Sequence, residues 1–283
     1  MNTESKKIWP KMVGGGIAGI FEIGLFHPID TLTKRTMYNK EKISKKNISQ
    51  ILFKEYSDKN ILDKYKSLYA GAKFGMFYKI LQRTYKYGGQ SVLNEKLKLT
   101  DNKSLNQAIT GSLIGAGEVI LLPLDVLKIR MQTNPDLIKN KSFLNIIKKE
   151  GMGLYRGSGI TILRNMPGSF ALFGANSFTK NVIFDLKDEQ KATLHQNFIS
   201  STIGALTCIT VSNPMDVIKV RIQAENKKQN YKKMAKEMLK EEGIGSFFKG
   251  LLPKSLTIAP KLIFSFTIAQ EIIKRIYRLT DNE

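Results

Sequence analysis

The sequence is built of long apolar stretches that end at single charged residues. Residues 12–21 are followed by Glu22, and residues 104–117 by Glu118. The longest uncharged run, Ala192–Met215, is long enough to cross a bilayer as a helix. Helices around a water-filled cavity face lipid on one side only, so we expect further spans that carry polar residues.

One motif occurs three times in this pattern. The segment Pro123–Gln132 (PLDVLKIRMQ) recurs at Pro214–Gln223 (PMDVIKVRIQ) and, with two changes, at Pro28–Met37 (PIDTLTKRTM). An element that recurs with a period near one hundred residues indicates an internal repeat. The predicted repeats are residues 7–100, 101–193 and 194–283.

Each repeat has the same internal plan. An apolar segment with small residues four apart, such as Gly111 and Gly115, precedes the motif proline, and this spacing lets helix backbones approach closely in a membrane. Pro28, Pro123 and Pro214 lie inside helical patterns, where the missing hydrogen bond is expected to kink the helix. A short amphipathic helix and a second long apolar segment follow. The expected fold is an all-α membrane protein with six transmembrane helices in three hairpins.

Composition indicates a negatively charged partner. The chain has 45 basic and 24 acidic residues, a net charge of +21, which favours nucleic acid, an anionic membrane face or an acidic small molecule. The single cysteine, Cys208, cannot form an internal disulfide or a multi-cysteine metal site. Because no paired-carboxylate, nucleophile or Walker-type motif is found, the sequence predicts neither an enzyme nor a bound metal or cofactor.

A second pattern follows the proline motif in each repeat. It is Tyr155–Gly157 (YRG) and Phe248–Gly250 (FKG), and it is reduced to Tyr69–Gly71 (YAG) in the first repeat. Together, the two patterns make the whole chain resemble the mitochondrial carrier family. The resemblance implies a multi-pass protein of the mitochondrial inner membrane that exchanges a solute by alternating access. It also implies short matrix-side helices, both termini in the intermembrane space, bound anionic phospholipid such as cardiolipin, and a monomer.

Further segments are similar to a nucleotide-exchanging branch of this family. They include Phe26–Thr31, Tyr85–Gln90 and Pro167–Gly174. This similarity implies antiport of guanine nucleotides, GTP against GDP.

The resemblance places a gate at the matrix end, where the three motif helices converge. Three acid–base pairs in a ring can close a pore reversibly, because each pair in a wet cavity is worth on the order of 1 kcal/mol. Carried over by position, Asp30 pairs with Lys128, and Asp125 pairs with Lys219.

The first repeat lacks two of the expected gate residues. Thr33 replaces the lysine that would pair with Asp216, and Met37 stands where Gln132 and Gln223 would brace the pairs. The gate then keeps two ionic pairs of three. We expect it to open more easily on the matrix side than a full network would.

The resemblance also places substrate contacts on the even-numbered helices, seven to eight residues beyond each signature glycine. An ionisable side chain at membrane depth is costly, so lining a water-filled pathway is its default explanation. Arg164 and Lys79 fit that explanation, whereas Lys254 could also reach lipid headgroups. The expected substrate-binding residues are Tyr78, Lys79, Gln82, Arg164, Asn165, Thr257 and Lys261.

Arg164 suits a guanine base. Guanine presents O6 and N7 as adjacent acceptors, which an arginine engages with two hydrogen bonds, whereas adenine presents an amino donor at that edge. Lys79, Lys254 and Lys261 would then take the phosphates. Arg164 could instead bind phosphate, and the sequence leaves both roles open.

Glu22 and Glu118 precede motif prolines on helices that are expected to line the cavity. They could pair with Arg164 or Lys79 in the empty protein, or carry a proton with the substrate.

Two other functions remain open from the sequence. Thr257, where a third basic contact would be expected, allows a carrier for another nucleotide or an organic anion. The charge of +21 alone would suit a basic peripheral or nucleic-acid-binding protein. Nucleic-acid binding calls for a contiguous basic patch, whereas here the basic residues are spread through loops, so no nucleic-acid partner is expected.

Overall fold

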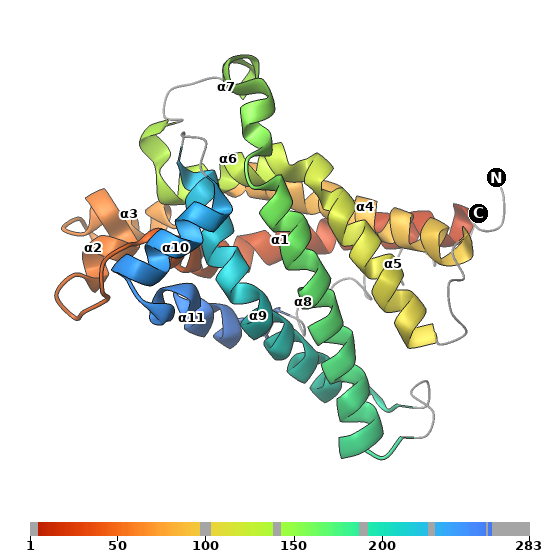
Figure 1. The fold of residues 1–283 in the computed structure, drawn as a ribbon. Coiled ribbons are helices and arrows are strands. Elements are labelled where there is room, and N and C mark those ends of the chain that lie inside the picture. Colours follow the sequence, from red (N-terminus) through yellow and green to blue (C-terminus); the bar gives the residue numbers. More distant parts are fainter. Residues whose placement is uncertain are drawn as a thin grey trace.

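Figure 1 shows the computed structural model, which describes residues 5–96, 103–137, 143–186, 192–225, 230–258 and 260–261. Every regular element in these ranges is a helix, which confirms the all-α fold class. The α-helices are α1 (Ser5–Tyr38), α2 (Ile48–Phe53), α3 (Ile61–Ser67), α4 (Ala72–Lys96), α5 (Lys103–Gly117), α6 (Leu122–Thr133), α7 (Phe143–Glu150), α8 (Ser158–Phe178), α9 (Leu194–Ala224), α10 (Tyr231–Glu241) and α11 (Leu251–Leu256). The shorter helical turns are η1 (Lys54–Tyr56), η2 (Glu118–Leu121), η3 (Pro135–Leu137), η4 (Gly151–Tyr155), the π-helical η5 (Thr179–Ile183) and η7 (Ile244–Phe248).

Among the described residues, no helix combines the length and apolar character of a membrane-spanning segment. This differs from the expectation for Ala192–Met215, because the hydroxyl and amide side chains of α9 lower its mean hydropathy. The part of the sixth predicted helix beyond Lys261 lies outside the described residues. The arrangement of six transmembrane helices therefore stays a prediction.

The long helices pack side by side in pairs. Helix α8 lies along α9 and also contacts α5, and α1 lies along α4 (Figure 1). Gly204 of α9 marks a close approach to α8, since a Cβ there would lie 2.7 Å from the Leu172 carbonyl oxygen. A glycine at this position lets the two backbones come this near.

The motif prolines differ in their effect on the helices. Helix α1 continues through Pro28, and α9 continues through Pro214. Before Pro123 the helix is interrupted by the 3₁₀ turn η2, and α6 begins with Pro123 in its first turn. Proline lacks the backbone N–H that would continue the α-helical ladder, which explains the interruption at this position.

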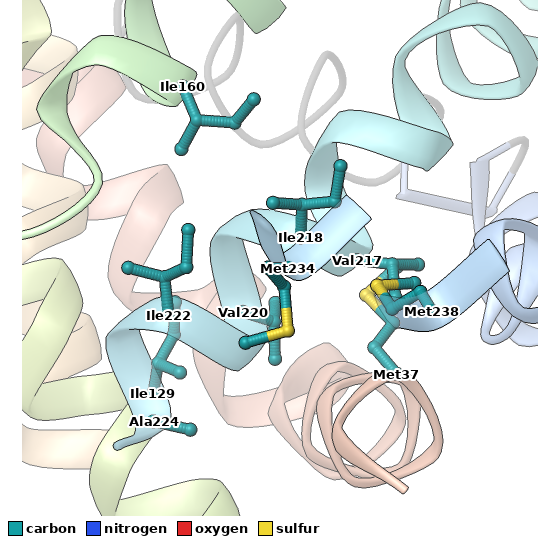
Figure 2. Close-up of a cluster of buried hydrophobic side chains, with 10 residues drawn as sticks. All are labelled: Met37, Ile129, Ile160, Val217, Ile218, Val220, Ile222, Ala224, Met234 and Met238. Carbon is teal, nitrogen blue, oxygen red and sulfur yellow. The ribbon is translucent and has the colours of Figure 1, made fainter. Parts of the chain in front are cut away.

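The largest apolar cluster joins the ends of the motif helices to one short amphipathic helix. Met234 and Met238 of α10 pack on the C-terminal half of α9 (Figure 2). Met37 from α1 and Ile129 from α6 lie in the same cluster. The cluster thus joins parts of all three predicted repeats through buried apolar contact, which is the main stabilising term in folding.

The three signature glycines share one backbone conformation. Gly71, Gly157 and Gly250 have φ angles of 76°, 78° and 77°, in the left-handed region that glycine adopts without strain. A Cβ on Gly250 would lie 2.9 Å from Met37 Cγ, and one on Gly71 would lie 3.0 Å from Met131 Cβ. Each of these glycines therefore lies against the motif helix of another predicted repeat.

Candidate functional site: a central cavity bounded by two polar rings

Three buried arginines form what we call the arginine collar: Arg35, Arg130 and Arg221. Arg35 Nε donates to the Gln132 carbonyl oxygen at 3.0 Å, and Arg130 Nε donates to the Gln223 carbonyl oxygen at 3.1 Å. Arg221 Nε closes the circle by donating to the Met37 carbonyl oxygen at 3.1 Å. The same contact thus links the first motif helix to the second, the second to the third, and the third to the first.

Acceptors on the short helices and turns fix the other donors of the collar. Arg130 Nη1 lies 2.6 and 2.7 Å from the two carboxylate oxygens of Glu150. Arg35 donates to the Ser67 carbonyl oxygen at 2.9 Å instead of to a carboxylate. Charge-assisted pairs of this kind hold both partners in place.

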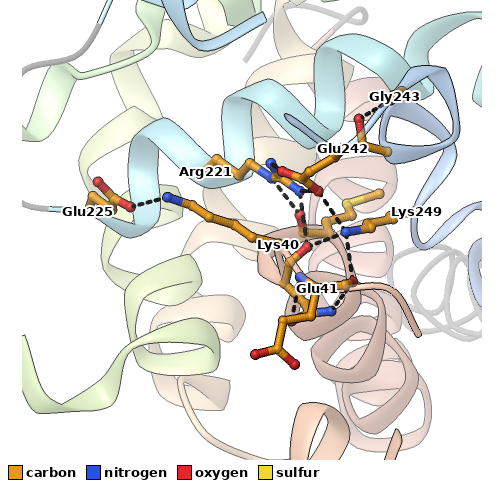
Figure 3. Close-up of polar contacts among 10 residues, drawn as sticks. Lys40, Glu41, Arg221, Glu225, Glu242, Gly243 and Lys249 are labelled. Atoms are coloured by element: carbon orange, nitrogen blue, oxygen red, sulfur yellow. Dashed lines mark hydrogen bonds and ion pairs between the residues drawn. The ribbon is translucent and has the colours of Figure 1, made fainter. Parts of the chain in front are cut away.

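Glu242 completes the collar in the third repeat. It accepts hydrogen bonds from Arg221 and, at 2.7 Å, from Lys249 Nζ (Figure 3). Burial alone would raise the pKa of Glu242, but these hydrogen bonds from two cations outweigh it and lower the pKa below the ordinary value of 4.5.

One turn or more back along the same helices lies a second ring, the aspartate ring, formed by Asp30, Asp125 and Asp216. Lys128 Nζ lies 2.5 Å from Asp30 Oδ2, and Lys219 Nζ lies 2.7 Å from Asp125 Oδ2. These are the two inter-repeat pairs that the resemblance to the family implies.

Asp216 pairs with residues that the sequence did not assign to the ring. Its Oδ1 lies 2.6 Å from Arg164 Nε, and its Oδ2 accepts from Lys254 Nζ. The Thr33 hydroxyl donates to the Ile29 carbonyl oxygen of its own helix at 2.8 Å. The expectation of a vacant third pair is therefore incomplete, because two cations from α8 and α11 replace the missing lysine.

The two predicted bracing glutamines behave differently. Gln132 Nε2 donates to Thr31 Oγ1 at 3.0 Å and reaches Asp30 Oδ2 at 3.3 Å. Gln223 Nε2 reaches the Arg156 carbonyl oxygen at 3.4 Å. Gln132 thus braces the ring, whereas Gln223 contacts the backbone beside the collar.

The aspartate ring opens onto a cavity of about 240 Å³. Seven basic and four acidic side chains line it, so the cavity carries a net positive charge. An enclosed excess of one sign attracts ligands of the opposite sign. The lining residues are Glu22, Ile23, Phe26, His27, Asp30, Lys34, Gly75, Tyr78, Lys79, Gln82, Asp125, Lys128, Arg164, Asp216, Lys219, Lys254 and Lys261.

Most of the predicted substrate-binding residues meet at this cavity. Tyr78, Lys79, Gln82, Arg164 and Lys261 line it. They come from α4, α8 and the segment after α11, which brings parts of three predicted repeats to one place.

Two predicted residues lie elsewhere. Asn165 is buried and donates to the Gly115 carbonyl oxygen at 2.5 Å, while its Oδ1 accepts from Arg164 Nη1 at 3.1 Å. Thr257 lines a neighbouring cavity of about 150 Å³ and donates back to its own helix. Asn165 therefore holds α8 against α5 and orients Arg164.

The carboxylate of Glu22, which also lines the cavity, forms ion pairs with three cations. Lys79 Nζ and Lys261 Nζ each lie 3.0 Å from Glu22 Oε1, and Arg83 pairs with the other carboxylate oxygen. The predicted pairing of Glu22 with Lys79 is confirmed. Arg83 was missed, although its position one helical turn after Lys79 could have indicated it.

Glu118 accepts a hydrogen bond from a residue that was not predicted as its neighbour. Gln82 Nε2 donates to Glu118 Oε2 at 3.2 Å and lies 3.2 Å from the Tyr78 hydroxyl. Lys34 and His27 also line the cavity without having been predicted. His27 Nε2 lies 2.9 Å from the Ala70 carbonyl oxygen, so its ring is held at the cavity wall.

Comparison with known proteins identifies the family. A sequence model described as mitochondrial carrier protein matches residues 100–187 and 190–279. The chain belongs to the mitochondrial carrier family. Its relatives are transporters, and carriers of this family reside in the mitochondrial inner membrane.

Three relatives extend over nearly the whole chain. The Mitochondrial GTP/GDP carrier protein 1 of Saccharomyces cerevisiae is 47% identical over 94% of this chain and 94% of its own length. An uncharacterized mitochondrial carrier of Schizosaccharomyces pombe is 48% identical over 93% of each chain. The mitochondrial 2-oxodicarboxylate carrier of Pongo abelii is 30% identical over 88% of each chain.

Proposed function

We propose that this protein exchanges guanine nucleotides, GTP against GDP, across the mitochondrial inner membrane. The observation that carries the proposal is the cationic cavity, which presents Arg164, Lys79 and Lys261 to a polyanionic ligand. The relative from S. cerevisiae, named as a GTP/GDP carrier and 47% identical, supports guanine nucleotides as the substrate.

The proposed mechanism is alternating access around this cavity. The aspartate ring would act as the matrix gate, closed in the arrangement described above and opened when its ion pairs separate. Pairs that are partly exposed contribute little each, so the two states can differ by only a few kcal/mol. The cyclic contacts of the collar support three repeats. The proposal gives each repeat two membrane helices, so that both termini lie on the same side, that of the intermembrane space.

Exchange in reconstituted liposomes tests the proposed function. Vesicles loaded with GDP and containing the purified carrier should take up labelled GTP and GDP. We expect ATP and a 2-oxodicarboxylate to enter at least ten times more slowly, since each lacks the acceptor edge that Arg164 would read. Faster uptake of either competitor would assign the carrier to another nucleotide or to an organic anion.

The membrane assignment has its own experiment. Alkaline carbonate washing of mitochondria strips peripheral proteins and leaves multi-pass proteins in the pellet. We expect the protein in the pellet as a monomer after mild solubilisation, with bound anionic phospholipid such as cardiolipin. Release into the wash would favour the basic peripheral protein instead.

A further inference from the structure

Asp216 differs from the other two aspartates of the ring in its ion-pair partners. Both of its carboxylate oxygens are held by cations of the central cavity, Arg164 on one side and Lys254 on the other. The side chain of Asp216 is 5% exposed, whereas that of Arg164 is 30% exposed. The acid is thus buried, and the arginine that holds it still faces the cavity.

One bidentate edge of the Arg164 guanidinium, formed by Nε and Nη2, faces Asp216 in this arrangement. Its Nε faces Asp216 at 2.6 Å, and its Nη1 donates to Asn165 Oδ1 at 3.1 Å. A planar ligand or a phosphate that takes two parallel hydrogen bonds from this edge needs the Nε that faces Asp216. A ligand that takes this edge must therefore displace Asp216.

Asp216 is the partner that a ligand can displace more easily. Asn165 is anchored by its second hydrogen bond to the Gly115 carbonyl oxygen. Asp216, in contrast, is a negatively charged group, and an anionic ligand brought to the same cations repels it. Phosphate and carboxylate compete for the same sites on arginine and lysine.

We propose that Asp216 is an internal competitor of the substrate, so that substrate binding itself opens the third side of the ring. When an anion takes Arg164 and Lys254, Asp216 loses both ion-pair partners seen among the described residues, and this side of the gate is released. The inference rests on the proposed function only in taking the cavity as the anion-binding site. The competition depends on the threonine at position 33. A lysine at this position would give Asp216 a partner that the substrate does not touch.

The substitution Thr33→Lys tests this coupling. Thr33 lines the 150 Å³ cavity together with Lys254, which pairs with Asp216, so a lysine side chain at position 33 can extend through this cavity toward that pair. Coupling between sites is reciprocal, so a substitute partner for Asp216 frees Arg164 and tightens substrate binding. We expect GDP to bind at least about fivefold more tightly, the lower end of the usual coupling range, while the maximal exchange rate falls by a similar factor. Thr33→Met, of similar length without the charge, is the matched steric reference.

Equilibrium binding by calorimetry and exchange rates in liposomes provide the two readouts. Tighter binding with slower exchange in Thr33→Lys, relative to Thr33→Met, supports the proposal. Slower exchange with unchanged or weaker binding overturns it, because Arg164 would then not be held back by Asp216. Asp216→Asn gives a second arm, and it should also tighten binding without adding a new ion pair.

Inorganic pyrophosphate separates this inference from the choice of substrate. It carries the charge of a nucleotide diphosphate and no base. If the wild-type protein fails to bind GDP, tighter pyrophosphate binding in Thr33→Lys still supports the competition at Arg164. Equal pyrophosphate affinity in Thr33→Lys and Thr33→Met overturns it.

Discussion

The arginine collar and the aspartate ring are built from the same three motif helices, yet they differ in symmetry and exposure. In the collar, Arg130 is fully buried, and each arginine donates to a carbonyl oxygen of another motif helix. In the ring, Asp30 is 29% exposed to the cavity, and Asp216 departs from the repeated pattern. The difference teaches that the collar is a fixed joint and that the ring is the part able to rearrange.

The largest expected effect comes from the collar. Arg130→Leu leaves Glu150 partly buried without its partner, and breaking such a pair costs about 3–5 kcal/mol of unfolding free energy. Thermal unfolding in detergent measures the loss. Lys233→Leu is the control, since Lys233 is 79% exposed and its pair with Glu237 is expected to contribute under ~0.5 kcal/mol. Equal unfolding temperatures for the two variants would refute a structural collar.

Arg164→Ala should cause a large loss of transport and a smaller loss of stability than Arg130→Leu, because Lys254 still pairs with Asp216. Removing one partner of a charge pair with the ligand costs about 2–5 kcal/mol, so GTP exchange should fall by roughly 30-fold or more. Arg164→Lys then distinguishes the two roles of this residue. If Arg164 reads the base, the lysine variant keeps uptake and loses the preference for GTP over ATP. A retained preference would assign Arg164 to the phosphates.

The stability that the collar contributes should decrease as the pH falls. The lowered pKa of Glu242 means that its stabilising contribution is fully present above about pH 4.5 and is lost as the pH falls through the lowered value. Glu242→Gln should cost about 1–3 kcal/mol at pH 7, and its difference from the wild type should shrink toward pH 3.5. Unfolding temperatures across that range measure this. Glu237→Gln, at a half-exposed site, should show no such convergence.

The smallest expected effect is a difference in exchange rate between substitutions of Gln132 and of Gln223. Gln132→Met copies the first repeat, where Met37 fills the position, and it removes the contact with Asp30. Losing one hydrogen bond weakens the ring by about 0.5–1.5 kcal/mol, so exchange should become faster by up to roughly tenfold if ring opening limits it. Gln223→Met should leave the exchange rate near that of the wild type. The same acceleration in both variants would argue that the glutamines act alike.

Much of the architecture could be predicted because it rests on repetition. The helical class and the resemblance to the family follow from motifs in register, and the pairs Asp30–Lys128 and Asp125–Lys219 are what that resemblance implies. The collar could have been found in the same way, because Arg35, Arg130 and Arg221 also recur in register. The acceptors of their three Nε atoms are backbone carbonyls, however, and these leave no signature in a sequence.

The sequence by itself thus determined the family, the helical fold and the position where the ring is imperfect. Only the tertiary structure decided which cations pair with Asp216 in place of a lysine at position 33. It also decided that Asn165 faces α5 instead of the cavity. Both depend on contacts between helices distant in the chain, which no local spacing encodes. Asp216 is buried, and a buried carboxylate requires a cation, so the fold supplies Arg164 and Lys254 where the first repeat does not.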